Sequence, residues 1–298
     1  MAEITTEREV LVTRTRPWTK VAAVLSGGPV IPLIVIFLFV FAALFADIIT
    51  VHDSELVELP NRLKTPVFFD GGSWAHPLGT DPLGRDILTR IVYGARVSII
   101  IAVTALALGG GFGTMIGLVA GFYRGKVDTL LMRLADITLA FPLILFAILL
   151  VMVLGPSMMN VIIAIALVLW ARYARVIRGE VLGLMERDFI ARARVSGASD
   201  FRIMARHLLP NVMPTLIVLL TLQVGWVIIV EASLSFLGAG IPPPTPAWGS
   251  MLADGREYVS TAWWVTTVPG IAIMLVVLAF NLCGDWLREK LDPKQRSV

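Results

Sequence analysis

The loop residues best placed to bind a ligand are His76, Asp81 and Asp86, which recur at five-residue steps. Imidazole and carboxylate groups are ordinary metal ligands, so this spacing could hold a divalent cation. Prolines and glycines lie between these residues, however, and they predict a turn-rich loop that does not present side chains along one regular face. From the sequence we therefore expect no metal site in this chain.

Patterns for nucleotide binding and catalysis fail on spacing or context. Valine follows Lys126, whereas a phosphate-binding P-loop needs serine or threonine after its lysine. Gly111 and Gly113 lie in an apolar run with no preceding strand, so they do not form a dinucleotide site. Ser196 lacks the glycine-flanked elbow of a serine hydrolase, and a single cysteine, Cys283, cannot form a disulfide within the chain. We expect no catalytic residue and no cofactor bound by this chain.

Glu231 is the clearest acid inside an apolar run. An unpaired carboxylate in a membrane costs on the order of 3 kcal/mol, so such a residue needs water, a donor or a positive charge beside it. One interpretation is contact with a cationic group on a transported substrate. The alternative is a partner on a neighbouring helix, and the sequence leaves both open.

The composition is typical of an integral membrane protein. Hydrophobic residues make up 57% of the chain and charged residues 16%, against about half and about a quarter in soluble domains. The net charge of +3 is modest and its basic residues flank apolar runs, so we expect contact with membrane lipid and no nucleic acid. A membrane-spanning helix needs roughly 20 apolar residues. Six runs predict an all-α fold with six transmembrane helices: residues 29–49, 97–122, 139–154 (beginning near 130), 158–176, 212–234 and 264–283.

The distribution of basic residues orients these predicted helices. Lysine and arginine cluster before the first run, after the second, between the fourth and fifth, and after the last. Positively charged loops favour the cytoplasm, so both termini are expected there. Residues 51–95, which carry both signs of charge, are expected to form a long external loop. Arg172, Arg175 and Arg178 fall three apart and are interpreted as lipid-headgroup anchors that could also face a partner.

Four glycines in the second run, Gly109, Gly113, Gly117 and Gly121, recur at every fourth residue. This spacing places them on one helix face as a groove, and small residues let membrane helices approach closely. We expect tight packing within the chain, with a mobile contact to a partner subunit as the alternative.

A polar, arginine-rich segment at 188–211 separates the fourth and fifth runs. Helix-forming residues stand on either side of Gly197, and Leu209-Pro210 is expected to stop the helical pattern. Glycine permits a sharp turn between two helical pieces. The segment is therefore expected to be a docking element on the cytoplasmic side.

The sequence FIARARVSGASDFRIMARHLLPN in this segment resembles the cytoplasmic EAA loop of bacterial ABC importer permeases. Ala193, Gly197, Leu209 and Pro210 stand at the motif's positions, whereas an alanine and an arginine at 191–192 replace the common glutamate and alanine. HPLGTDPLGRDILTRIVYGARVSI and LSFLGAGIPPPTPAWGSML also resemble the peptide-importing branch. The resemblance runs from about residue 76 to 293 and is strongest to the C-type permease subunit of dipeptide and oligopeptide importers. Nickel and glutathione importers share this subunit pattern.

The resemblance implies a type I ABC importer permease with a cytoplasmic coupling loop at about 186–210. It implies two ATPase subunits that use ATP and Mg²⁺, a second homologous permease, an external substrate-binding protein, a peptide substrate, and a place in the bacterial cytoplasmic (inner) membrane. The ATPase-coupling residues would be Ala191, Arg192, Ala193, Gly197, Ala198, Ser199, Leu209 and Pro210.

The expected organisation has four parts. Residues 1–28 form a cytoplasmic leader, 29–75 the first transmembrane helix and external loop, 76–293 the permease core with five transmembrane helices, and 294–298 a cytoplasmic tail. A secondary transporter or channel is a less favoured alternative, because it would be expected to carry more acids in its spans. A membrane enzyme would need a nucleophile–base pair or metal cluster within the bilayer.

Overall fold

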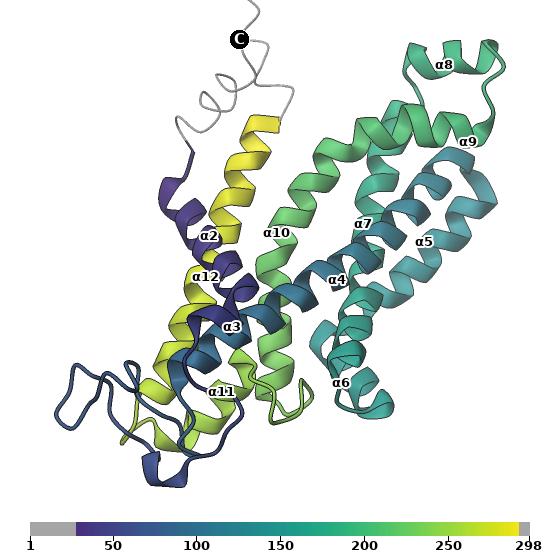
Figure 1. Ribbon diagram of the computed structural model, residues 1–298. Coiled ribbons are helices and arrows are strands. Elements are labelled where there is room, and N and C mark those ends of the chain that lie inside the picture. The colour runs from purple at the N-terminus through teal and green to yellow at the C-terminus, as the bar shows by residue number, and fades with distance from the viewer. Residues whose placement is uncertain (1–27, 292–298) are drawn as a thin grey trace, which may run out of the picture.

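The computed structural model describes residues 28–291, and in that range the chain is helical, with no β-strand (Figure 1). Most of the expected leader at 1–28 and the tail at 294–298 lie outside the described residues. The helices are α2 Val30–Leu44, α3 Ala46–Ile49, α4 Ile87–Tyr123, α5 Gly125–Ala140, α6 Leu143–Leu154, α7 Met158–Leu184, α8 Asp188–Val195, α9 Asp200–Ile203, α10 Leu209–Phe236, α11 Trp248–Gly255 and α12 Trp264–Leu291.

The described part of the chain has four helices long and apolar enough to cross a membrane, and a fifth if α5 and α6 count as one broken span. The four are α4, α7, the continuous helix Asp200–Phe236 and α12. α2 is also apolar but has only 15 residues, or about 22 Å, which is short of the ~30 Å of hydrocarbon. The all-α membrane fold is confirmed, whereas six full-length spans are not.

The expected single helix for the third span is wrong. α5 and α6 meet at Phe141 and Pro142, where the chain bends by 91°. Proline disfavours helical backbone at the residue before it, and Phe141 has an extended ψ of 138°. An apolar run was therefore correctly located, but the proline divides it.

The expected external loop at 51–95 is too long, because α4 begins at Ile87. Asp86 caps this helix by accepting a hydrogen bond from the Thr89 backbone N–H at 2.8 Å. The first turns of α4 carry charged residues that lower their hydropathy but have partners in the fold. Arg90 donates to the Ser54 carbonyl at 2.9 Å, and Arg96 forms an ion pair with Asp47 at 2.9 Å.

The loop before α12 also contains a helix that the sequence analysis missed. α11 begins with Trp248, which is buried and donates from its indole nitrogen to the Ile91 carbonyl of α4 at 3.0 Å. An added Cβ on Gly249 would come within 2.1 Å of the Ala232 carbonyl oxygen of α10. The loop before α12 is therefore partly a short helix packed against α4 and α10.

The four regularly spaced glycines face α7. A Cβ added to any of Gly109, Gly113, Gly117 or Gly121 would come within 3.0 Å of an α7 atom, and at Gly113 it would lie 2.3 Å from the Trp170 carbonyl oxygen. α4 and α7 thus lie close along the glycine face, and their side chains form the centre of the larger buried cluster, which includes Ile101, Ile165 and Leu169. This contact fixes the two helices against each other within one chain.

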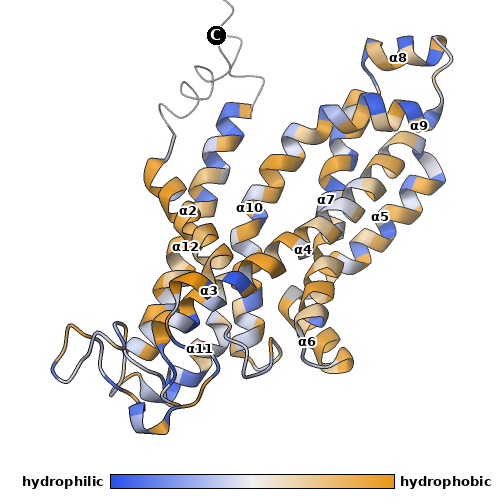
Figure 2. Cartoon of the chain, in the orientation of Figure 1, coloured by the Kyte–Doolittle hydropathy of each residue, from blue (hydrophilic) through white to orange (hydrophobic). Residues whose placement is uncertain are grey.

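The two ends of the helix bundle differ in character. Figure 2 shows hydrophobic residues along the helices, and hydrophilic residues at α8 and α9 and in the loops at the opposite end. The start of α2, the end of α12 and the α8–α9 segment lie toward one end, whereas α11 and the long loop before α4 lie toward the other (Figure 1). The arginine-rich segment is therefore presented away from the long loop.

Candidate functional site

The segment from α8 to α9 stands out at one end of the helix bundle: a short connection joins α8 to α7, and α9 runs directly into α10 (Figure 1). Gly197 lies between α8 and α9 and has a φ of +75°. Its backbone N–H donates to the Arg194 carbonyl at 2.9 Å, and the Ala198 N–H donates to the Ala193 carbonyl at 3.1 Å. This pair of bonds is the Schellman motif, which satisfies the last carbonyls of a helix and favours glycine at the position of positive φ.

The next helix begins with a side-chain cap. Ser199 accepts a hydrogen bond from the Arg202 backbone N–H at 3.4 Å, and α9 starts at Asp200. Gly197 therefore ends one helix and Ser199 starts the next, so the turn between them has a defined geometry. Both residues were expected at the coupling site.

The expected stop at Leu209-Pro210 is wrong. The helix runs continuously over Asp200–Phe236, with a π-helical turn at Met204–Leu208 immediately before the proline. Pro210 has no backbone N–H, and a local widening of the helix is one way to accommodate the lost bond and the ring. A displacement of α9 would consequently be transmitted directly to α10.

α8 is attached to the bundle at few points. Ile190 is 1% exposed and belongs to the same buried cluster as Phe122 at the end of α4. The Arg194 guanidinium lies over the Phe122 ring, 5.8 Å from its centre, within the range of a cation–π contact. Arg124 forms an ion pair with Glu186 at 2.6 Å just before α8. These contacts hold the inner face of α8 and leave its other face open.

The predicted coupling residues divide into partly buried and exposed positions. Ala193, Ala198 and Leu209 pack against the chain's own buried cluster. Ala193 is only partly buried in this way, and its part in the coupling contact stays a prediction. The remaining predicted residues are exposed: Ala191, Arg192, Gly197, Ser199 and Pro210.

Sequence reasoning missed two apolar residues on either side of the turn. Val195 is 91% exposed and Phe201 is 77% exposed. They lie two residues before and four residues after Gly197, in a segment otherwise rich in arginine. Their apolar character in that polar context was the signal that could have identified them. Each leaves a largely exposed apolar side chain near the turn.

Arg172, Arg175 and Arg178 all have partners inside the chain. Arg178 binds Asp128 of α5 through two hydrogen bonds of 2.5 and 2.6 Å, and Arg175 pairs with Asp136 of the same helix. The Arg172 guanidinium lies over the Trp226 ring of α10 at 5.1 Å. These arginines hold α5 and α10 to α7, and their contact with lipid headgroups stays a prediction.

Glu231 lies inside the chain and not on an open surface. It is 1% exposed and accepts a hydrogen bond from the Ser235 hydroxyl, one turn later on α10, at 2.8 Å. Ser98 of α4 faces the same carboxyl group. This position favours the alternative of a helix–helix partner, and the proposed contact with cationic cargo stays a prediction.

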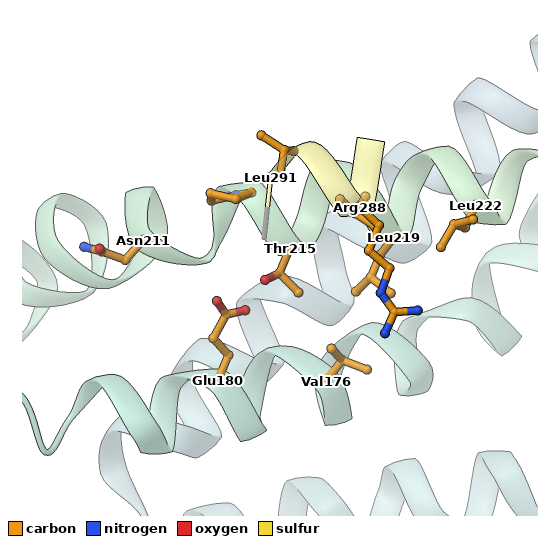
Figure 3. Close-up of a pocket in the computed structure, with 10 residues that line it drawn as sticks. Val176, Glu180, Asn211, Thr215, Leu219, Leu222, Arg288 and Leu291 are labelled. Carbon is orange, nitrogen blue, oxygen red and sulfur yellow. The ribbon is translucent and has the colours of Figure 1, made fainter. Parts of the chain in front are cut away.

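A cavity of about 450 Å³ lies between α7, α10 and α12 (Figure 3). Its polar lining residues are Glu180 of α7, Asn211 and Thr215 of α10, and Arg288 of α12. Figure 3 shows Glu180 and Arg288 directed into the space between the helices, with Thr215 above the carboxylate. The sequence analysis did not identify this cavity, because its lining comes from three separate helices whose packing brings it together.

Comparison with known proteins gives a consistent result. Residues 113–297 match the family described as binding-protein-dependent transport system inner membrane component. The di/tripeptide transport system permease protein DppC of Pseudomonas aeruginosa (strain UCBPP-PA14) is 43% identical over 266 residues, which are 89% of this chain and 88% of that protein.

Two further relatives cover similar shares. The dipeptide transport system permease protein DppC of Haemophilus influenzae is 41% identical over 90% of this chain and 91% of its own length. The glutathione transport system permease protein GsiD of Escherichia coli O6:K15:H31 is 44% identical over 87% of this chain and 84% of its own length. Each alignment covers more than four fifths of this chain.

Proposed function

This chain belongs to the family of binding-protein-dependent transport system inner membrane components, and we propose that it is a permease subunit of an ATP-driven importer of dipeptides or oligopeptides. The observation that carries this proposal is the geometry of the α8–α9 segment. α8 stands out from the helix bundle, and one turn joins it to the continuous helix Asp200–Phe236, which is long and apolar enough to span the membrane.

Peptide cargo is supported by the di/tripeptide and dipeptide permeases among the relatives. The glutathione permease is as similar, at 44% against 43% identity. Glutathione is itself a peptide, so both relatives favour a substrate with amide bonds and charged ends. Import of glutathione is the second candidate function.

The proposed assembly contains a second, similar permease, two ATPase subunits and an external substrate-binding protein. Val195 and Phe201 support the ATPase contact, because exposed apolar side chains flanking a rigid turn are suited to a groove on a partner. ATP and Mg²⁺ would be used by the ATPase subunits. This chain would contribute the passage and the coupling contact without catalysing hydrolysis itself.

The structure suggests how motion would reach the passage. α9 continues into α10 without an intervening loop, and α10 lines the cavity that also contains Glu180 and Arg288. When the ATPase subunits close, displacement of α8 and α9 would tilt α10 and change the space between α7, α10 and α12. The second permease would complete the passage on the other side.

The proposal also gives an orientation. The end of the bundle that contains the start of α2, the α8–α9 segment and the end of α12 would face the cytoplasm, where ATP is available. The long loop before α4 would be external. Both termini would then be cytoplasmic, as the basic residues near them favour. Binding of the ATPase at the α8–α9 end would test this orientation and the coupling contact together.

A tagged chain purified from its native membrane should therefore carry ATP-hydrolysing subunits with it. Phe201→Asp should lose most of them, because a buried aromatic contact in an interface is worth about 2 kcal/mol or more and the new carboxylate has no expected partner. Phe68→Asp is the matched control: Phe68 is 78% exposed, against 77% for Phe201, but lies in the long loop at the other end. Equal retention of ATPase by both variants would contradict the proposed contact.

A further inference from the structure

Three side chains that are separate in the sequence meet beside the start of α4: His52, His76 and Asp86. One potential ligand atom of each lies within 4.8 Å of the others. The two imidazole rings stack with their centres 4.8 Å apart and their planes 28° from parallel. Two of the chain's three histidines lie in this cluster.

The local fold holds His76 and Asp86 in place. Asp86 is 4% exposed, and its Oδ2 accepts the Thr89 backbone N–H that caps α4 at 2.8 Å. Its Oδ1 lies 3.1 Å from Nδ1 of His76, which is 5% exposed. The backbone between them is folded back, because the Ile87 N–H donates to the Gly79 carbonyl at 3.1 Å. The two ligands therefore need little rearrangement to share an ion.

His52 is positioned by a different contact. Two residues along, the Ser54 carbonyl accepts a hydrogen bond from buried Arg90 of α4 at 2.9 Å. This bond ties the segment after α3 to the first turn of α4. The His52 ring is only partly buried, and its Nε2 lies 2.7 Å from the Ala75 carbonyl, so the ring can rotate by giving up one hydrogen bond.

The charges around the cluster distinguish Asp86 from Asp81. The Asp81 carboxylate is compensated by Arg85 at 2.6 Å and by Arg90 at 3.7 Å. Among residues 28–291, the only basic side chain within salt-bridge distance of Asp86 is His76. A buried carboxylate without a permanent cation beside it is costly, and a bound metal ion supplies that charge.

We propose that His52, His76 and Asp86 form a binding site for a divalent transition-metal ion of the zinc class, with water completing the coordination. Two imidazoles and one carboxylate suit such ions, whose bonds to these ligands are about 2.0–2.2 Å long. The His52 donor atom must come closer to those of His76 and Asp86, and the partly exposed His52 ring makes that movement. The ion would clamp the segment after α3 to the capped start of α4.

This site replaces the ligand set considered from sequence. His76 and Asp86 belong to both sets, but Asp81 is paired with arginines, and His52 takes the third position in the proposed site. The sequence-based expectation of no metal rested on regular spacing along one segment. The structure instead brings the third ligand, His52, from the start of the same long loop.

The test is Zn²⁺ binding by the full-length chain, purified in detergent with a tag that contains no histidine, followed by isothermal titration calorimetry. Wild type should bind about one equivalent. His52→Ala removes a partly exposed ligand, and Asp86→Asn removes the charge while retaining a residue that caps helices well. Each should weaken binding at least about tenfold, because the loss of even an outer-shell partner of a metal ligand typically costs about 10–100-fold.

His207→Ala is the control, because His207 lies between α9 and α10, in the segment at the other end of the bundle. It should bind Zn²⁺ as wild type does. No saturable binding by wild type would overturn the proposal, as would binding unchanged in both His52→Ala and Asp86→Asn. Loss on His207→Ala with retention in the other variants would also overturn it.

Discussion

Gly197 is suited to the turn between α8 and α9 because its backbone can adopt a positive φ, and not because a side chain would lack space there. Its φ is +75°, and a Cβ added there would meet nothing within 4 Å. A β-branched residue resists this conformation, whereas asparagine adopts it more readily. The sequence correctly placed a turn at this glycine, although the two Schellman hydrogen bonds could be seen only in three dimensions.

We therefore predict that Gly197→Val disturbs coupling while Gly197→Asn largely preserves it. The left-handed conformation costs an ordinary residue about 1–2 kcal/mol, and valine more, so the turn between α8 and α9 should shift in the valine variant. Peptide transport and peptide-stimulated ATP hydrolysis by the assembled complex should fall together. Wild-type rates for Gly197→Val would show that the turn is only a solvated connector.

Glu231 illustrates what a single residue's context can and cannot reveal. The free-energy cost of an unpaired carboxylate within an apolar run could be inferred from the sequence. Ser235 lies one helical turn away on the same face. The proximity of Ser98 could not be inferred, because it depends on how α4 packs against α10. The sequence thus identified a residue that needs a partner without identifying the helix that supplies it.

At the scale of helices, the contact between α4 and α7 depends on the absence of side chains at four positions. An added methyl group at Gly113 would lie 2.3 Å from a backbone oxygen of α7, which cannot move independently of its helix. Gly111, two residues away, has nothing within 4 Å of an added Cβ. The two positions form a matched pair on opposite faces of one helix.

Gly113→Ala should therefore destabilise the chain by about 1–3 kcal/mol, the usual cost of overpacking a tight contact. Gly111→Ala should be neutral or slightly stabilising, because alanine favours helix more than glycine does. Thermal unfolding of the two purified variants in the same detergent measures the difference. Equal melting temperatures would mean that α4 and α7 can separate without cost.

Hydropathy predicted the apolar centres of the helices better than their ends. It located the cores of α4, α7, α10 and α12, but it missed the first ten residues of α4 because Arg90 and Arg96 lower the local hydropathy. Both arginines have partners in other segments. It also joined α5 and α6 into one span, because the apolar composition continues across the bend at Pro142.

At the scale of the molecule, the family and the position of the coupling segment could be predicted from motifs. The cavity between α7, α10 and α12 and the cluster of His52, His76 and Asp86 could not. Each combines residues from distant parts of the chain, and helix crossings and loop paths bring them together. The sequence therefore indicated the protein family, and the structure was needed to locate the cavity and the histidine–aspartate cluster.

The central claim is that ATP hydrolysis by partner subunits drives peptide import through this chain. The most direct measurement is uptake of a labelled dipeptide into proteoliposomes containing the complex purified through this chain, with its binding protein supplied on the substrate side. Uptake should require ATP and Mg²⁺ on the side of the ATPase subunits and should continue when ionophores remove all ion gradients. Uptake that follows an imposed ion gradient without ATP would contradict the account and favour a secondary transporter.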